Sequence, residues 1–165
     1  MITRYDFVTR FGGVIEHSPY LAERAVDAKI IPEPLTATGI HTALVTMFRA
    51  ASPAERLAVL RAHPDLAGKL AISGKLTADS RQEQAGAGLD RLTAQEHARF
   101  TELNKAYVAK FGFPFIIAVK GLSKDDILEA FEMRINNDRD AEFSTATAQV
   151  EKIALLRLQS MLPET

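Results

Sequence analysis

Helix start and stop signals recur at almost every junction of this chain, and they constrain its fold more than any other feature. Each predicted start pairs a short polar side chain, which can accept from free amides, with a proline or an acid in the first turn. These starts are Thr3 with Asp6, Ser18 with Pro19, Ser52 with Pro53 and Glu55, Thr93 with Glu96, and Ser123 with Asp126. Glycines at 12, 13, 86, 88, 112 and 121 follow periodic segments, where a residue at positive φ is favoured. The pattern predicts about eight helices.

Apolar periodicity supports the same arrangement. Two sets of residues are predicted to lie each on one helical face: Phe100, Leu103, Tyr107 and Phe111, and then Val150, Ile153, Ala154 and Met161. The one strand-like stretch, "FPFIIAV" at 113–119, contains a proline and has no obvious partner strand, so we expect a buried extended segment. We therefore predict an all-α fold, a single compact domain over residues 1–165 with no repeat or linker.

Composition excludes several classes of protein. The chain has 165 residues, 47% of them hydrophobic, which suits one globular domain. Its net charge of -1 gives no bulk electrostatic signal for nucleic acid or an anionic membrane. There is no cysteine, and the four histidines show no i, i+4 pairing, so we expect no metal site. Charged residues occupy the N-terminus where a signal peptide needs an apolar block, which favours a cytoplasmic protein.

Arg157 is the least expected residue, because it falls in the middle of the apolar stripe of the last predicted helix. A guanidinium in that position must find an anion. One interpretation is a structural ion pair with a buried or half-buried Asp or Glu. The other is that Arg157 holds a substrate carboxylate or phosphate through a bidentate contact.

His63 directly precedes Pro64, in "RAHPDLAG", at the seam between two helical stretches. Proline keeps the preceding residue out of the helical region, while its own φ suits the first turn of a new helix. At a helix N-terminus the dipole favours a neutral imidazole, able to exchange a proton near neutral pH, although Asp65 partly offsets this. The alternative is an ordinary capping or surface histidine.

Two further stretches place polar groups beside the core. Ser80, Glu83 and Gln84 share one helical face and can line a pocket. Alternatively, Ser80 and Glu83 form a capping box, unless the helix begins earlier, at Thr77 with Asp79. In "FGFPFIIAVKG" at 111–121, an extended backbone without a ladder needs hydrogen-bond partners, and beside a cavity it can read the amide edges of a flat polar heterocycle.

Taken together, these stretches resemble the family of 2-oxo-4-hydroxy-4-carboxy-5-ureidoimidazoline (OHCU) decarboxylases of urate breakdown. The resemblance runs through nearly the whole chain, in "FVTRFGGVIEHSP", "RAHPDLAGKLA", "SRQEQAGAGLDRLT", "NKAYVAKFGFPFIIAVKG", "FEMRINND" and "KIALLRL". It implies an all-helical, commonly homodimeric enzyme that works without metal or organic cofactor on a small-molecule substrate, not on nucleic acid or membranes. The C-terminal "LPET" lacks the peroxisomal tripeptide of some eukaryotic relatives, which favours the cytoplasm.

The resemblance also implies site residues. His63 matches the catalytic histidine of the family, Glu83 its active-site glutamate and Arg157 its active-site arginine. Positions that surround the substrate ring are matched by Pro64, Ser80, Gln84, Phe115, Ile116, Ile117, Ala118 and Val119. Two rival hypotheses are a helical binding or adaptor module without catalysis and a related lyase, hydrolase or isomerase acting on a ureido compound. The adaptor predicts that His63, Glu83 and Arg157 do not converge.

Overall fold

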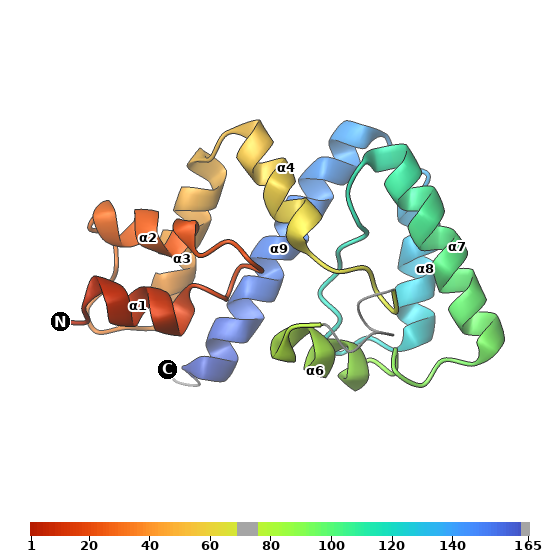
Figure 1. The fold of residues 1–165 in the computed structure, drawn as a ribbon, viewed down its shortest axis with the longest axis horizontal. Coiled ribbons are helices and arrows are strands. Elements are labelled where there is room, and N and C mark those ends of the chain that lie inside the picture. The colour runs from red at the N-terminus through yellow and green to blue at the C-terminus, as the bar shows by residue number, and fades with distance from the viewer. Residues whose placement is uncertain (69–75, 163–165) are drawn as a thin grey trace. The chain divides into compact units, whose positions relative to one another are not determined.

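The computed structural model describes residues 1–68 and 76–162. Within these ranges the chain forms helices and no strand, which confirms the all-α prediction (Figure 1). The helices are α1 (Arg4–Phe11), α2 (Tyr20–Asp27), α3 (Ala37–Ala50), α4 (Pro53–Ala62), α6 (Ala78–Gly86), α7 (Ala94–Phe111), α8 (Lys124–Arg134) and α9 (Arg139–Met161). None of these helices has the length and apolarity needed to cross a bilayer. Most of "LPET" lies at 163–165, outside the described residues.

Most of the predicted helix starts are confirmed. Side chains of Thr3, Thr93 and Ser123 accept from the amide three residues on, and Ser52 and Glu55 cap α4 reciprocally. The start at α2 differs, because its N-cap is Pro19, which has no side-chain capping bond, while the Ser18 hydroxyl donates to the Glu16 carbonyl.

The predicted glycine stops are confirmed in part. Gly88 and Gly112 have φ of 82° and 81° just after α6 and α7, as expected, whereas Gly121, with φ of 82°, follows the extended segment and precedes α8. Gly12 keeps a helical φ of -64°, and Gly86 is the last residue of α6. Helix ends therefore follow the sequence signals, although not every terminating glycine is used for its left-handed conformation.

The chain divides into two compact units, residues 1–62 with 150–165 and residues 63–149. In the first unit α1 packs against α2, and α2 against α3. Its fully buried side chains include Phe7, Phe11, Leu21, Ile40, Leu44 and Phe48. The apolar stripe of α9 is buried at Val150, Ile153 and Ala154, but Met161 is exposed, because the stripe does not extend to the end of the helix. The single-domain arrangement stays a prediction.

The second unit is built around an aromatic cluster. The predicted face of α7 is buried, and the Tyr107 ring lies 4.5 to 5.9 Å from four phenylalanine rings, those of Phe111, Phe113, Phe115 and Phe131. Phe115 also stacks on Phe131 of α8 with ring centroids 3.9 Å apart. Between α7 and α8, residues 113–119 are extended, as predicted (Figure 1), and all of them are buried except Ile117, which is half-buried. Ring contacts fix this stretch in the core of the unit.

Candidate functional site

His63 lies just beyond the end of α4 and is 8% exposed. The sequence predicts a new helix at Pro64, but residues 64–68 form a turn instead. The helix-dipole argument for a neutral His63 therefore does not hold within this stretch. Leu66 and Ala67 of the turn are buried, and Ala67 adopts a φ of 52°, a conformation that L-residues rarely adopt. Such a turn needs support from the residues around it.

Two side-chain amides from neighbouring helices hold this turn. The Ala67 amide donates to Gln84 Oε1 over 2.9 Å, and Gln84 Nε2 donates to the Asp65 carbonyl over 3.3 Å. Asn104 Nδ2 of α7 donates to the Leu66 carbonyl over 2.9 Å. Three consecutive residues of the turn are thereby bonded to α6 or α7. Gln84, which is predicted to surround the substrate ring, uses both of its hydrogen bonds described here to hold the backbone that follows His63.

The N-terminus of α6 decides between the two interpretations of Ser80 and Glu83. Thr77 is the N-cap, and its side chain accepts from the Ser80 amide over 3.2 Å. The helix therefore begins at the earlier of the two predicted starts, and the capping box of Ser80 with Glu83 is wrong. Ser80 and Gln84 are each 5% exposed, whereas Glu83 is half-buried.

The extended segment 115–119 is held by side chains in place of a strand. The Ala118 amide donates to Gln149 Oε1 over 2.9 Å, and Arg134 Nη1 donates to the Ile116 carbonyl over 2.8 Å. All five residues are buried except Ile117, which is half-buried. The expectation that this backbone needs partners is confirmed, and two of its groups find them within the protein.

Arg134 is itself part of a buried polar cluster that the sequence analysis did not identify. Its Nε donates to Glu142 Oε1 over 2.5 Å, and its guanidinium lies 4.4 Å from the Phe115 ring centroid. Glu142 is fully buried and also accepts from Asn137. Burial, and secondarily the Glu142 carboxylate, raises the pKa of the Tyr107 hydroxyl. In the sequence, Arg134 and Glu142 are charged residues near helix ends, and exposed helices show the same pattern.

Arg157 belongs to the first unit, on the buried face of α9. Its Nη1 donates to Glu16 Oε2 over 2.7 Å and to the Val14 carbonyl over 3.3 Å. The Arg157 and Glu16 side chains are 5% and 2% exposed. The structural ion pair that the sequence analysis weighed is therefore present. Whether Arg157 also holds a substrate anion stays a prediction.

Five of the predicted site residues, His63, Pro64, Ser80, Glu83 and Gln84, lie at the turn or on α6, which holds the turn through Gln84. The His63–Pro64 turn and Gln84 are linked directly, Ser80 and Glu83 share α6 with Gln84, and 115–119 lies in the same unit. The convergence of this group with Arg157 stays a prediction. Within the described residues, no three His, Cys, Asp or Glu side chains are grouped as a metal site requires.

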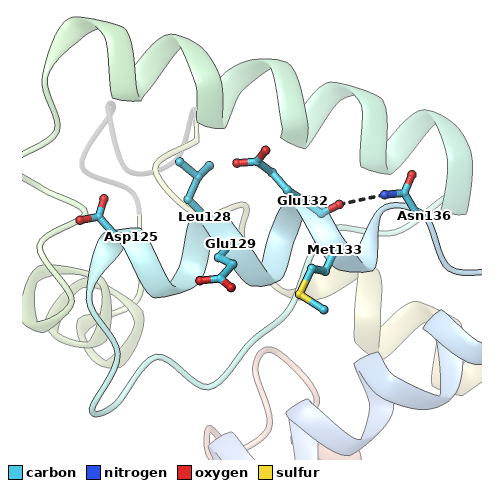
Figure 2. A pocket seen from close by; sticks show the side chains of 6 residues that line it. All are labelled: Asp125, Leu128, Glu129, Glu132, Met133 and Asn136. Atoms are coloured by element: carbon cyan, nitrogen blue, oxygen red, sulfur yellow. Dashed lines mark hydrogen bonds between the residues drawn. The ribbon is translucent and has the colours of Figure 1, made fainter.

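A shallow hollow lies elsewhere, on the outer face of α8 (Figure 2). It is lined by Asp125, Leu128, Glu129, Glu132, Met133 and Asn136. Met133 is 67% exposed, and none of the six is a predicted site residue. An open, acidic surface hollow is a poor place to exclude water from a bound anion, so this hollow is not the candidate site.

Comparison with known proteins gives one consistent result. A family model described as OHCU decarboxylase matches residues 1–159. The 2-oxo-4-hydroxy-4-carboxy-5-ureidoimidazoline decarboxylase of Halalkalicoccus jeotgali is 41% identical over 94% of this chain and 84% of its own length. The protein of the same name from Haloferax volcanii is 39% identical over 93% of this chain and 87% of its own length. The crystal structure of an (S)-allantoin synthase is similar with a TM-score of 0.77 and 31% identity, over 98% of this chain and 51% of that chain. This chain belongs to the OHCU decarboxylase family.

Proposed function

We propose that this protein decarboxylates OHCU to (S)-allantoin in urate degradation. The observation that carries the proposal is the match of the OHCU decarboxylase family to residues 1–159. The decarboxylase names of the relatives support the reaction, and the (S)-allantoin synthase name of a structural relative supports the product. The protein is a carboxy-lyase with a small-molecule substrate.

The substrate supplies its own electron sink. Its carboxylate sits on a carbon that also bears a hydroxyl group and adjoins a C=N bond. When the C–C bond to carbon dioxide breaks, its electron pair flows into that imine. The protein has to align the scissile bond with the imine, so that the imine nitrogen takes up the electron pair and a proton. It also has to move the hydroxyl proton away and protonate the neighbouring carbon on one face. This chemistry supports a reaction without metal or organic cofactor.

His63 is the proposed proton carrier, and Glu83 orients it or the substrate hydroxyl. Two observations support these roles. The turn after His63 is held by side-chain hydrogen bonds. Helix α6 has its N-cap at Thr77, so Glu83 does not form a capping box with Ser80. Pro64, Ser80, Gln84 and the 115–119 segment surround the substrate ring in this proposal. General acid–base help of this type contributes about 10² to 10⁴ fold, so positioning has to supply much of the rest.

Arg157 is the proposed partner of the substrate carboxylate. A buried arginine that is already paired with Glu16 is held in one orientation, and a guanidinium has five donors, so one carboxylate does not exhaust it. In this proposal Glu16 fixes the orientation in which the arginine meets the substrate carboxylate. The protein acts as a cytoplasmic homodimer, as the family resemblance implies.

The deciding experiment follows product formation directly. Urate is oxidised fresh, the resulting 5-hydroxyisourate is hydrolysed enzymatically, and allantoin is followed by circular dichroism with and without this protein. We expect faster, stereoselective formation of (S)-allantoin, unchanged after exhaustive chelation. Absence of acceleration by folded protein would remove the proposed activity, and a loss restored by zinc or manganese would remove the cofactor claim.

Two substitutions then test the site. His63→Asn should lower turnover about 10² fold or more with the fold intact, and retention of a third of the activity would place proton transfer elsewhere. Arg157→Met should abolish activity, but it also orphans buried Glu16, at a cost of about 3 to 5 kcal/mol in unfolding free energy. The double variant Glu16→Gln/Arg157→Met removes that charge, so it should regain stability without regaining turnover. Normal turnover per folded molecule in either variant would make Arg157 purely structural.

A further inference from the structure

Asn104 is the one side-chain amide on the buried face of α7. Its neighbours on that face are Leu103 and Tyr107, and Asn104 itself is 7% exposed. Burying an amide costs free energy unless its groups are hydrogen-bonded. Within the described chain Asn104 Oδ1 is buried and has no hydrogen-bond partner, so only the Nδ2 bond to Leu66 offsets this cost. An apolar side chain at this position would avoid the cost altogether. What the Asn104 amide adds over such a side chain is its bond to the Leu66 carbonyl.

The bond from Asn104 to the Leu66 carbonyl contacts the turn two residues after Pro64, close to His63. Pro64 has a fixed φ and no N–H, so the link from His63 to the turn is stiff. Beyond it, the chain can adjust only through the residues at 65–67. Gln84 holds the first and last of these residues, and Asn104 holds the middle one. Without the Asn104 amide, the buried Leu66 carbonyl loses this donor, and of the side-chain bonds described for the turn only those from α6 remain.

We propose that Asn104 is a positioning residue of the decarboxylation reaction: its amide fixes the Leu66 carbonyl and thereby the orientation of His63. The inference rests on the proposed role of His63 in proton transfer. Asn104 does not touch the reacting atoms in this proposal. It acts through the backbone. Its loss therefore lowers the fraction of protein molecules in which the His63 side chain has the orientation needed for proton transfer.

The test compares the same substitution at two asparagines. Asn104→Leu removes the donor at nearly constant volume and adds no charge. Asn136→Leu is the matched control, because Asn136 Nδ2 also donates to a backbone carbonyl, that of Glu132 over 3.1 Å, but from the exposed turn just after α8 (Figure 2). We expect kcat to fall about 10 to 100 fold in Asn104→Leu, with KM within about 3 fold, and both to stay unchanged in Asn136→Leu.

A second readout does not depend on activity. Amide hydrogen exchange at Ala67 should quicken at least about 10 fold in Asn104→Leu, while exchange at Tyr107 in α7 stays at the wild-type rate. If the leucine variant does not fold, Asn104→Ser is smaller, stays polar and serves for the same measurements. Unchanged exchange at Ala67 together with unchanged kcat in a folded variant would overturn the proposal. So would a loss of activity that only follows the unfolded fraction.

A double-mutant cycle separates this inference from the proposed role of His63. If Asn104 acts through His63, then adding Asn104→Leu to His63→Asn should lower kcat by less than about 2 fold further. A full additional loss in that background would overturn the positioning role. If His63→Asn alone is silent, the proton-transfer assignment fails, whereas the exchange rate at Ala67 still reports on the turn.

Discussion

Two irregular stretches of the second unit meet the same physical problem with different chemistry. The turn at 64–68 and the segment at 113–119 both bury backbone polar groups without helix or sheet partners. The turn is fastened by two neutral amides, Gln84 and Asn104. The segment is fastened by one amide, Gln149, and by Arg134, whose charge is balanced by buried Glu142.

The two stretches owe their rigidity to different interactions. Neutral amides satisfy a donor or an acceptor at little desolvation cost, so the turn depends on hydrogen-bond geometry alone. The segment carries five aromatic or branched apolar residues that already pack in the core, and its buried ion pair is costly to break. We therefore expect changes at the turn to affect catalysis first, and changes at the segment to affect stability first.

The largest expected effect is on stability, at Arg134. Arg134→Met orphans the fully buried Glu142 carboxylate and removes the donor to the Ile116 carbonyl. We expect the free energy of unfolding in urea to fall by about 3 to 5 kcal/mol. The double variant Arg134→Met/Glu142→Leu should recover much of the loss. Equal stability of the single and double variants would contradict the view that the orphaned charge is the cost.

A matched control for this prediction is an exposed ion pair. Arg24 donates to both Glu55 oxygens and lowers the pKa of Glu55 to about 2. Because solvent screens this pair, Glu55→Gln should change stability much less than Arg134→Met, and glutamine can still cap α4. An equal loss of stability would show that burial is not what makes the Arg134 pair important.

A smaller effect is expected at Gln84, where the comparison predicts a catalytic phenotype. Gln84→Leu leaves the Ala67 amide and the Asp65 carbonyl without their bonds, which should lower the unfolding free energy by about 2 kcal/mol. The protein should stay folded at 25 °C, and kcat should fall more than KM rises. Steady-state kinetics beside urea denaturation checks this. Unchanged kcat would mean that the turn does not control His63.

Gln149→Leu is the corresponding change at the segment, and its effect should be smaller again. Only the Ala118 amide loses a partner, at a cost of about 1 to 2 kcal/mol. Because the segment is expected to contact the substrate ring, KM should rise while kcat is largely kept. A fall in kcat with KM unchanged would reverse the assigned roles of the two stretches.

The smallest predicted effect is the pH dependence of Asp65 in the turn. Partial burial raises the pKa of this carboxyl above its ordinary value of 3.8. As pH rises, the unfolded chain loses this proton first, so the contribution of Asp65 to stability falls between pH 3.8 and the higher folded pKa. Asp65→Asn should remove this decrease and raise the melting temperature at pH 7 by less than about 3 °C. A lower melting temperature of the Asp65→Asn variant at pH 7 would mean that the folded protein favours the charged form of the Asp65 carboxyl group.

Contacts between near neighbours in the sequence were predictable. The Thr93–Glu96 capping box depends on atoms three residues apart, so the residue types almost suffice. For α6 the sequence left two possible starts, and the structure selects the one at Thr77. The buried face of α7 follows from helical period alone. The burial of Arg157 follows in the same way, because its neighbours at helical spacing are apolar.

Only the tertiary structure decided which polar groups meet. The Asn104–Leu66 bond joins residues 38 positions apart, and Glu16 is 141 positions from Arg157. No periodicity encodes such pairs, since the partner depends on how separate elements pack. The sequence by itself determined the helices, their buried faces and the need of isolated polar groups for partners. Packing of distant elements chose the partners, because a hydrogen bond is specified by distances of about 3 Å that only the folded chain defines.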